Sequence, residues 1–375
     1  MYAVVDVGSN TVRLNIYKIE YGQPVPVLSR KESVGLASYV RNGQMLPAGI
    51  QRVTEVLSSF KVLLDGLKIS NVHVFATAAL RNAKNSRAAV GEIIKNSGMD
   101  VHVISGEMEA ELDFIGASHA LENMDSGILV DIGGGSTELV PYKDGKMLNA
   151  VSLPFGSLNT YDKFVANILP TAKERKAIKK AVTEALKKLP DEFAKGSYPV
   201  ICGVGGTARA ANKLAVDMFR LPAEETSINV INLGKMIKIL ENDEKDSVPV
   251  DALDILVRVI PYRVRTILPG MIVLQTIAKY FGGETIEVTE AGGREGYLYK
   301  FVVNGEVEAE TPQSGGETGK TGRGRRSKRA EKAEEKKPRA RRTRRKAEAT
   351  SEEPRPQAQE VVMQEVVTEN EGTEA

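Results

Sequence analysis

The sequence is poor in the features that mark disulfide-bonded, zinc-binding and membrane-spanning proteins. Cys202 is the single cysteine in 375 residues, which excludes an intramolecular disulfide and fits a reducing compartment. The three histidines, at positions 73, 102 and 119, show no metal-ligand spacing. No apolar run approaches the roughly 20 residues that a membrane-spanning helix needs. We therefore expect a cytoplasmic protein that makes no membrane contact.

The beginning of the chain has no basic segment of the kind that opens a signal peptide. The short apolar run of residues 1–5 is followed directly by an acid, Asp6, and we therefore expect a first strand here. The length allows two domains with cores of their own, and the hydrophobic content of 42% is ordinary for a globular protein.

The net charge of +2 conceals an uneven distribution. Residues 320–346 contain 15 Lys and Arg against 3 Glu, a local charge of +12, so the remainder of the chain carries −10. The stretch 305–375 is too polar to bury a core, and we expect it to be disordered. Its basic block, 320–346, is either a solvated tail without a partner or a cationic arm that contacts a polyanion.

Two glycine-containing acidic turns, at 6–10 and 131–138, are the most informative feature of the chain. Each follows an apolar, strand-like run and precedes more strand-like sequence. Backbone N–H groups in such a turn can hold phosphate oxygens, and the aspartate at the strand end can hold a divalent cation against them. Two such loops facing each other would clamp a phosphate, whereas either loop alone is also compatible with an ordinary β-hairpin.

The hydrophobic periodicity predicts the same α/β unit twice, which indicates an internal duplication with a cleft between the halves. In the first half we expect three strands over 2–34, further strands at 72–75 and 101–104, and helices at 46–67, 87–95 and, after an N-cap at Ser105, up to 121. In the second half we expect strands at 127–130, 198–203 and 284–288, and helices at 171–188, 206–216, 234–243 and 268–281.

Several segments together resemble the exopolyphosphatase/guanosine pentaphosphate phosphohydrolase family, a branch of the actin, Hsp70 and sugar-kinase superfamily. They are spread in order over residues 1–303: 6–14, 76–85, 103–110, 131–139, 203–208 and 294–296. The resemblance implies an α/β fold class with two actin-like ATPase (ribonuclease H-like) domains and an interdomain cleft.

The expected domains are 1–120, joined by a returning helix at 293–303, and 121–292. Because the stretch after 304 leaves no room for a further helical domain, we expect the short form of the family.

The resemblance also assigns roles to individual residues. It implies that Glu109 is the general base that activates water and that Asp131 and Glu138, joined by Asp6, bind Mg²⁺ or Mn²⁺. The expected phosphate-binding residues are Gly8, Ser9, Asn10, Arg13, Arg81, Gly133, Gly134, Gly135, Ser136 and Thr137. Arginine suits this task because its guanidinium forks onto phosphate oxygens.

Each assignment has a plainer alternative. Arg13 and Glu138 can be solvent-facing strand residues, and Glu109 can be one of the acids that commonly begin a helix. The helix N-terminus after Ser105 favours an ionised carboxylate at Glu109, the state that a base requires. Residues 203–208 also match a weak dinucleotide-binding fingerprint, but no suitably spaced acid closes a second strand.

Two further segments bear on the substrate. Residues 315–321 imitate a Walker A loop but lack its first glycine, its strand and its helix. Residues 262–265 add positive charge where many family members have acidic residues.

The resemblance thus implies release of terminal phosphate from inorganic polyphosphate, or hydrolysis of guanosine pentaphosphate to the tetraphosphate. The sequence is also compatible with an ATP-dependent kinase of the same superfamily and with a non-catalytic polyanion binder. We also expect a homodimer, and a tail that contacts polyphosphate or nucleic acid.

Overall fold

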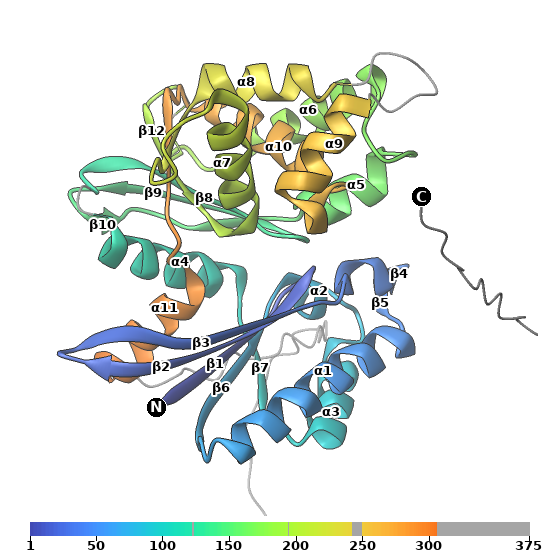
Figure 1. The fold of residues 1–375 in the computed structure, drawn as a ribbon, viewed down its shortest axis with the longest axis vertical. Helices are drawn as coiled ribbons and strands as arrows, with labels where there is room; N and C mark the ends of the chain where they lie inside the picture. The colour runs from blue at the N-terminus through green and yellow to red at the C-terminus, as the bar shows by residue number, and fades with distance from the viewer. Residues whose placement is uncertain (122–123, 194, 242–249, 306–375) are drawn as a thin grey trace, which may run out of the picture. The chain divides into compact units, whose positions relative to one another are not determined.

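The computed structural model describes residues 1–121, 124–193, 195–241 and 250–305. The predicted disordered tail, 305–375, lies outside these ranges apart from its first residue. The described residues belong to one unit, built around two large sheets (Figure 1). None of the described helices combines the length and the apolar character needed to cross a bilayer.

The first sheet has the strand order β3-β2-β1-β6-β7, with an antiparallel meander at one side and two parallel strands at the other. Its strands are β1 (Tyr2–Val7), β2 (Thr11–Glu20), β3 (Gln23–Ser33), β6 (Asn71–Ala76) and β7 (Val101–Val103). The three-strand meander predicted over 2–34 is therefore confirmed.

Helices α1 (Pro47–Gly66) and α3 (Ser86–Ser97) pack together on this sheet. Helix α1 buries Val53, Leu57 and Phe60 on one face, as its periodicity predicts, and has a proline in its first turn. Short elements complete this half: η1 (Leu36–Tyr39), β4 (Val40–Arg41), β5 (Gln44–Met45) and α2 (Ala78–Arg81).

The second sheet repeats the strand order of the first, with β10-β9-β8-β12-β14 in the places of β3-β2-β1-β6-β7. Its strands are β8 (Ser126–Ile132), β9 (Thr137–Lys143), β10 (Lys146–Met147), β11 (Val151–Leu153), β12 (Val200–Val204), β13 (Ser227–Asn229) and β14 (Thr285–Val288). Strand β11 pairs with β9, and β13 adds an antiparallel edge to β14. The repeated order confirms the predicted duplication.

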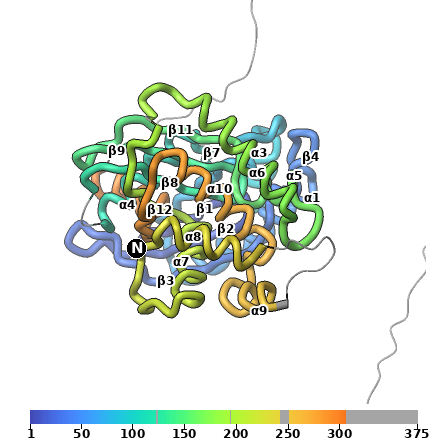
Figure 2. Tube along the Cα trace, turned by 90° about the horizontal axis from the view of Figure 1, so that it is seen from above, coloured from blue at the N-terminus to red at the C-terminus, as the bar shows by residue number. Residues whose placement is uncertain are grey.

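Helices cover the second sheet, with α7 and α10 against its strands and α6 and α8 packed beside α10 (Figure 2). They are α5 (Ser157–Phe164), α6 (Ala172–Leu186), α7 (Gly205–Phe219), α8 (Val230–Ile239), α9 (Val250–Val259) and α10 (Ile267–Tyr280), with η2 (Pro261–Arg263) before α10. Helix α8 begins four residues before the predicted 234 because the side chain of Asn229 caps it, accepting from the amide of Ile231.

Helix α4 (Gly106–Ala120) is shared by both halves. One of its faces packs on the second sheet through Ala110, Phe114 and Ala117, and Leu112 packs with residues of the first sheet. Helix α11 (Gly293–Tyr297), continued by the π-helical η3 (Leu298–Val303), returns against α4 and β1. The predicted returning helix is confirmed, whereas the predicted domain boundary after residue 120 stays a prediction.

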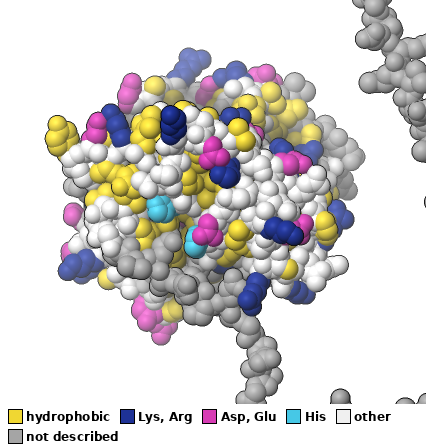
Figure 3. All heavy atoms as spheres, turned by 90° about the horizontal axis from the view of Figure 1, so that it is seen from below, with side chains coloured by type: hydrophobic (Ala, Val, Ile, Leu, Met, Phe, Trp, Pro, Cys, Tyr) yellow, Lys and Arg dark blue, Asp and Glu magenta, His cyan; other side chains and the backbone are white. Residues whose placement is uncertain are grey.

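The face of the first half that Figure 3 shows carries basic and acidic side chains in mixture over its described part. Charges of both signs next to one another weaken the field that a long polyanion would meet. This face therefore does not have the pattern of a polyanion-binding surface.

The close contact between α4 and the start of α11 generates a stability prediction. A methyl group on Gly116 would overlap the backbone of Gly292, whereas one on Gly91, in the middle of α3, meets nothing within 4 Å. We expect Gly116→Ala to lower the free energy of unfolding by about 1–3 kcal/mol through overpacking. Gly91→Ala, the matched control, should raise it by about 0.5–1 kcal/mol through helix propensity. Urea unfolding measures both, and stabilisation by both variants would contradict the α4–α11 contact.

Candidate active site

The two glycine loops lie against each other. A Cβ on Gly134 would stand 3.1 Å from the backbone nitrogen of Asn10, and one on Gly135 would stand 2.6 Å from Ser9 Oγ. A side chain at either position would crowd the other loop, so glycine favours this approach. Residues of both loops line one pocket, which also reaches α4, α7 and the start of α11.

Helix α5 orients the second loop. The carbonyl of Gly133 accepts from the amide of Ser157 at 2.8 Å, and that of Gly134 accepts from Leu158 at 3.0 Å. In a trans peptide the carbonyl and the amide point in opposite directions, so the amides of Gly134 and Gly135 point away from α5. Amides directed in this way can donate to phosphate oxygens.

Each loop connects the two strands of a hairpin, and in each hairpin an aspartate lies opposite a charged residue, which differs between the two. Asp6 lies opposite Arg13 across β1 and β2, and Asp131 lies opposite Glu138 across β8 and β9. Residues directly opposite in a sheet share a face. The duplicated hairpin therefore joins opposite charges in the first half and like charges in the second.

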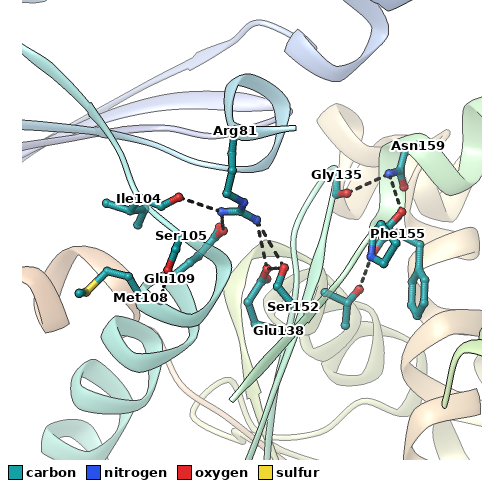
Figure 4. A network of polar contacts seen from close by, with 12 residues as sticks. Arg81, Ile104, Ser105, Met108, Glu109, Gly135, Glu138, Ser152, Phe155 and Asn159 are labelled. Atoms are coloured by element: carbon teal, nitrogen blue, oxygen red, sulfur yellow. Dashed lines mark hydrogen bonds and ion pairs between the residues drawn. The ribbon is translucent and has the colours of Figure 1, made fainter. Parts of the chain in front are cut away.

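Glu109 stands in the first turn of α4, where Ser105 caps the helix by accepting from the amide of Met108. Its Oε2 lies 2.6 Å from Nη1 of Arg81 (Figure 4). Burial raises the pKa of Glu109 to about 7, against the opposing effect of Arg81. The helix N-terminus predicted an ionised carboxylate, but desolvation outweighs that effect here. A pKa near neutrality suits a general base.

Arg81 connects Glu109 with Glu138. Its Nη2 lies 3.9 Å from Oε1 of Glu138 and 3.4 Å from Oγ of Ser152, which donates to Glu138 at 2.7 Å (Figure 4). The guanidinium thus contacts Glu109, which lines the pocket, and Glu138, which does not, and Arg81 itself lies outside the lining. Binding of phosphate by Arg81 stays a prediction.

The predicted site residues fall into two groups. Those that line the pocket are Asp6, Gly8, Ser9, Asn10, Arg13, Glu109, Asp131, Gly133, Gly134 and Ser136, and those outside its lining are Arg81, Gly135, Thr137 and Glu138. Thr137 is fully buried, and its hydroxyl donates to the carbonyl of Phe155 at 2.6 Å. Glu138 is likewise fully buried.

The carboxylates of the site fit a divalent cation. Asp131 Oδ1 and Glu138 Oε2 are buried and have no hydrogen-bond partner within the described residues. Burial first, and neighbouring carboxylates next, raise the pKa of Glu138, and burial raises that of Asp131. Among the described residues no three acidic, histidine or cysteine side chains converge into a metal cage. Mg²⁺ needs no such cage, since it keeps waters and accepts phosphate oxygens.

Arginines also line the pocket. They are Arg13 of β2, Arg209 of α7 and Arg263 of η2, with Arg294 of α11 next to Asp6. Burial and mutual repulsion lower the pKa of both Arg13 and Arg263 to about 10, so both remain cations at neutral pH. Arg263, in the segment 262–265 with its added positive charge, lies over the Gly206 backbone.

Sequence reasoning missed three charged side chains of the pocket. Asp113 lines the pocket one helical turn after Glu109, and the i, i+4 spacing of the two acids, which puts them on one helix face, is the signal that could have revealed it. Arg209 lies one turn into α7 after Gly205 and Gly206, which also line the pocket. Arg294 lies in the segment 294–296 that resembles the family, but its bond to Asp6, at 3.4 Å, joins residues too distant in sequence for any local pattern.

Comparisons with known proteins bear on the family and the fold of the chain. A family model described as the Ppx/GppA phosphatase family matches residues 15–304. The crystal structure of the Aquifex aeolicus member of that family is similar, with 26% identity, a TM-score of 0.65, and 82% of this chain and 99% of that chain covered.

A crystal structure of an exopolyphosphatase from Cytophaga hutchinsonii has the same fold. Its TM-score is 0.72 at 24% identity, with 81% of this chain and 98% of that chain covered. These matches confirm the predicted fold class.

The Arg81–Glu109 pair generates a prediction about ionisation. Arg81→Met removes the cation that lowers the pKa of Glu109, so this pKa should rise above 7. Carboxyl ¹³C NMR titration of selectively labelled protein measures the change. Arg87→Met, at an exposed position of α3, is the control and should leave Glu109 unaltered. An unchanged or lower pKa in Arg81→Met would show that the pair does not set the ionisation of Glu109.

Proposed function

The chain belongs to the Ppx/GppA phosphatase family, and from this premise we propose that it releases the terminal phosphate of inorganic polyphosphate. A phosphoanhydride hydrolase must hold the phosphates, neutralise their charge and direct a water in line at phosphorus. The pocket offers a group for each task. The observation that carries the proposal is the set of arginines, Arg13, Arg209, Arg263 and Arg294, that lines the same pocket as the two glycine loops.

In the proposed reaction the loop amides and the hydroxyl of Ser9 hold the terminal phosphate. The Glu109 carboxylate takes a proton from a water as the water oxygen bonds to phosphorus. The phosphoanhydride bond on the opposite side breaks, and Arg13 stabilises the charge on the departing chain. When bound at Asp131, with Asp6 and Glu138 nearby, Mg²⁺ or Mn²⁺ would neutralise charge on the phosphate oxygens.

The set of arginines favours polyphosphate over a nucleotide. Arg263 lies over Gly206, in the segment where kinases of the superfamily bind adenosine. The described residues that line the pocket include one aromatic side chain, Phe75, which is 3% exposed and therefore offers little surface for stacking a base. Several phosphates match several cations, whereas a purine would leave cations unpaired.

Phosphate release from polyphosphates of several lengths, guanosine pentaphosphate and ATP, measured side by side with Mg²⁺, tests the proposal. We expect the highest kcat/KM for polyphosphate and no release in EDTA. A higher kcat/KM for guanosine pentaphosphate would instead support hydrolysis of the nucleotide. Transfer of phosphate from ATP to an acceptor would support a kinase. The homodimer, the cytoplasmic location and the contact of the tail with polyanions stay predictions.

Glu109→Gln should lower kcat by a factor on the order of 10²–10⁴, because a positioned base contributes about that much. Binding should change little, since the amide preserves the shape of the side chain. In the wild type kcat/KM should fall as the pH drops below about 7, because Glu109 of the free protein then gains the proton that it must accept.

Glu107→Gln, an exposed neighbour on the same turn, is the control and should keep both rate and pH profile. If Glu109→Gln turned over rapidly and its rate still fell below about pH 7 as in the wild type, Glu109 would not be the base.

A further inference from the structure

Asp113 is a carboxylate of the pocket that the proposed reaction does not use. It lies on α4, one helical turn after Glu109, so the two side chains share a helix face. It is 4% exposed, yet it lines the pocket together with Glu109, Asp6 and Asp131. A buried acid in this position needs a physical explanation, because burying a charge without a partner is costly.

The hydrogen bonds of Asp113 do not supply that explanation. Its Oδ2 is buried and has no hydrogen-bond partner within the described residues, and the same holds for Oδ1 of Asp131. The carboxyl groups of Asp113, on α4, and Asp131, on β8, lie close enough to interact with each other, and burial raises the pKa of both. Apart from this contact, the two buried oxygens have no donor among the described residues. Orphaned oxygens of this kind are expected where a cation completes the site.

Three arginines around the pocket have partners other than Asp113, and among the described residues no arginine forms an ion pair with Asp113. Arg81 pairs with Glu109 at 2.6 Å, and Arg294 contacts Asp6 at 3.4 Å. Arg209 donates to the carbonyls of Thr289 and Glu290 at 3.2 Å. The cation that balances Asp113 is therefore expected to come from solution.

Asp113 is also better placed for this task than Glu138. Glu138 is fully buried outside the pocket lining, and its Oε1 accepts from Ser152. Asp113, in contrast, faces Gly292 and Gly293, where an added Cβ would come within 3.2 and 3.3 Å of its Oδ1. The glycines leave the carboxylate open on the side of the pocket.

We propose that Asp113 is a ligand of the divalent cation, which it holds together with Asp131. The inference rests on the proposed function, because it concerns the cation which that reaction uses. It adds a ligand from α4, so one helix carries both the water-activating base and a ligand of the cation. The rise of about 1.5 Å per residue along a helix would then fix the spacing of the two groups.

Binding of Mn²⁺ alone to the full-length protein tests the inference without any turnover. Electron paramagnetic resonance of free Mn²⁺ gives the dissociation constant, and thermal unfolding with and without Mn²⁺ gives an independent measure. We expect Asp113→Asn to weaken Mn²⁺ binding about tenfold or more, as Asp131→Asn should also do. Its metal-free melting temperature should equal or exceed that of the wild type, since a buried carboxylate without a partner is removed.

Glu107→Gln, an exposed acid on the same helix, is the matched control and should bind Mn²⁺ as the wild type does. Asp113→Leu, which fills the site with an apolar side chain, guards against a folding defect specific to asparagine. The inference is overturned if either folded variant binds Mn²⁺ with wild-type affinity, or if the wild type does not bind Mn²⁺. Wild-type affinity of a variant would overturn the role of Asp113 but would not contradict hydrolysis of polyphosphate by the wild type. The two proposals can therefore fail independently.

Discussion

The contact between the two glycine loops is the constraint on which the rest of the site depends. Gly134 and Gly135 approach Ser9 and Asn10 so closely that an added Cβ would lie 2.6–3.2 Å from their atoms. This contact brings together the ends of two hairpins that lie in different sheets. Because the hairpins are duplicates, their aspartates, Asp6 and Asp131, enter the same pocket from opposite sides. A phosphate bound there would meet amides and hydroxyls of both halves.

The pocket holds carboxylates of β1, α4 and β8 together with arginines of β2, α7, η2 and α11. Arg294 and Asp6, which have opposite charges, lie 3.4 Å apart. Such a set of buried charges is costly in the absence of substrate and cation, because burial shifts the pKa of Glu109, Asp131 and Arg263 toward their neutral forms. A bound polyanion would neutralise the arginines, and a bound divalent cation would neutralise the carboxylates. Together they would offset the cost of burying both sets of charges.

Helix α4 links this electrostatic arrangement to the fold. Ser105 fixes its first turn, its apolar residues pack on the second sheet, and Gly116 admits the backbone of Gly292 at the start of α11. A helix held from three directions keeps Glu109 in place relative to β8. Rigid placement matters for a base because misplacement of a reacting group by about 1 Å can cost a hundredfold in rate.

The sequence by itself determined the features that arise from neighbouring residues. The glycine turns, the meander of the first strands and the Ser105 cap depend on local backbone preference and could be predicted. The repeated sheet could also be predicted, because the hydrophobic periodicities of strands (2) and helices (3.6) occur in the same order in both halves. The short helix α5 did not, since eight residues give too little periodicity.

The tertiary structure alone decided which charges meet. Arg81 pairs with Glu109 across 28 positions, and Arg294 reaches Asp6 across 288. No local pattern encodes such pairs, because they depend on how the two sheets pack around α4. The same packing buried Glu138 completely and placed Asp113 in the pocket. Local sequence patterns thus identified the candidate phosphate loops, whereas long-range packing determined the burial and ionisation of the groups around them.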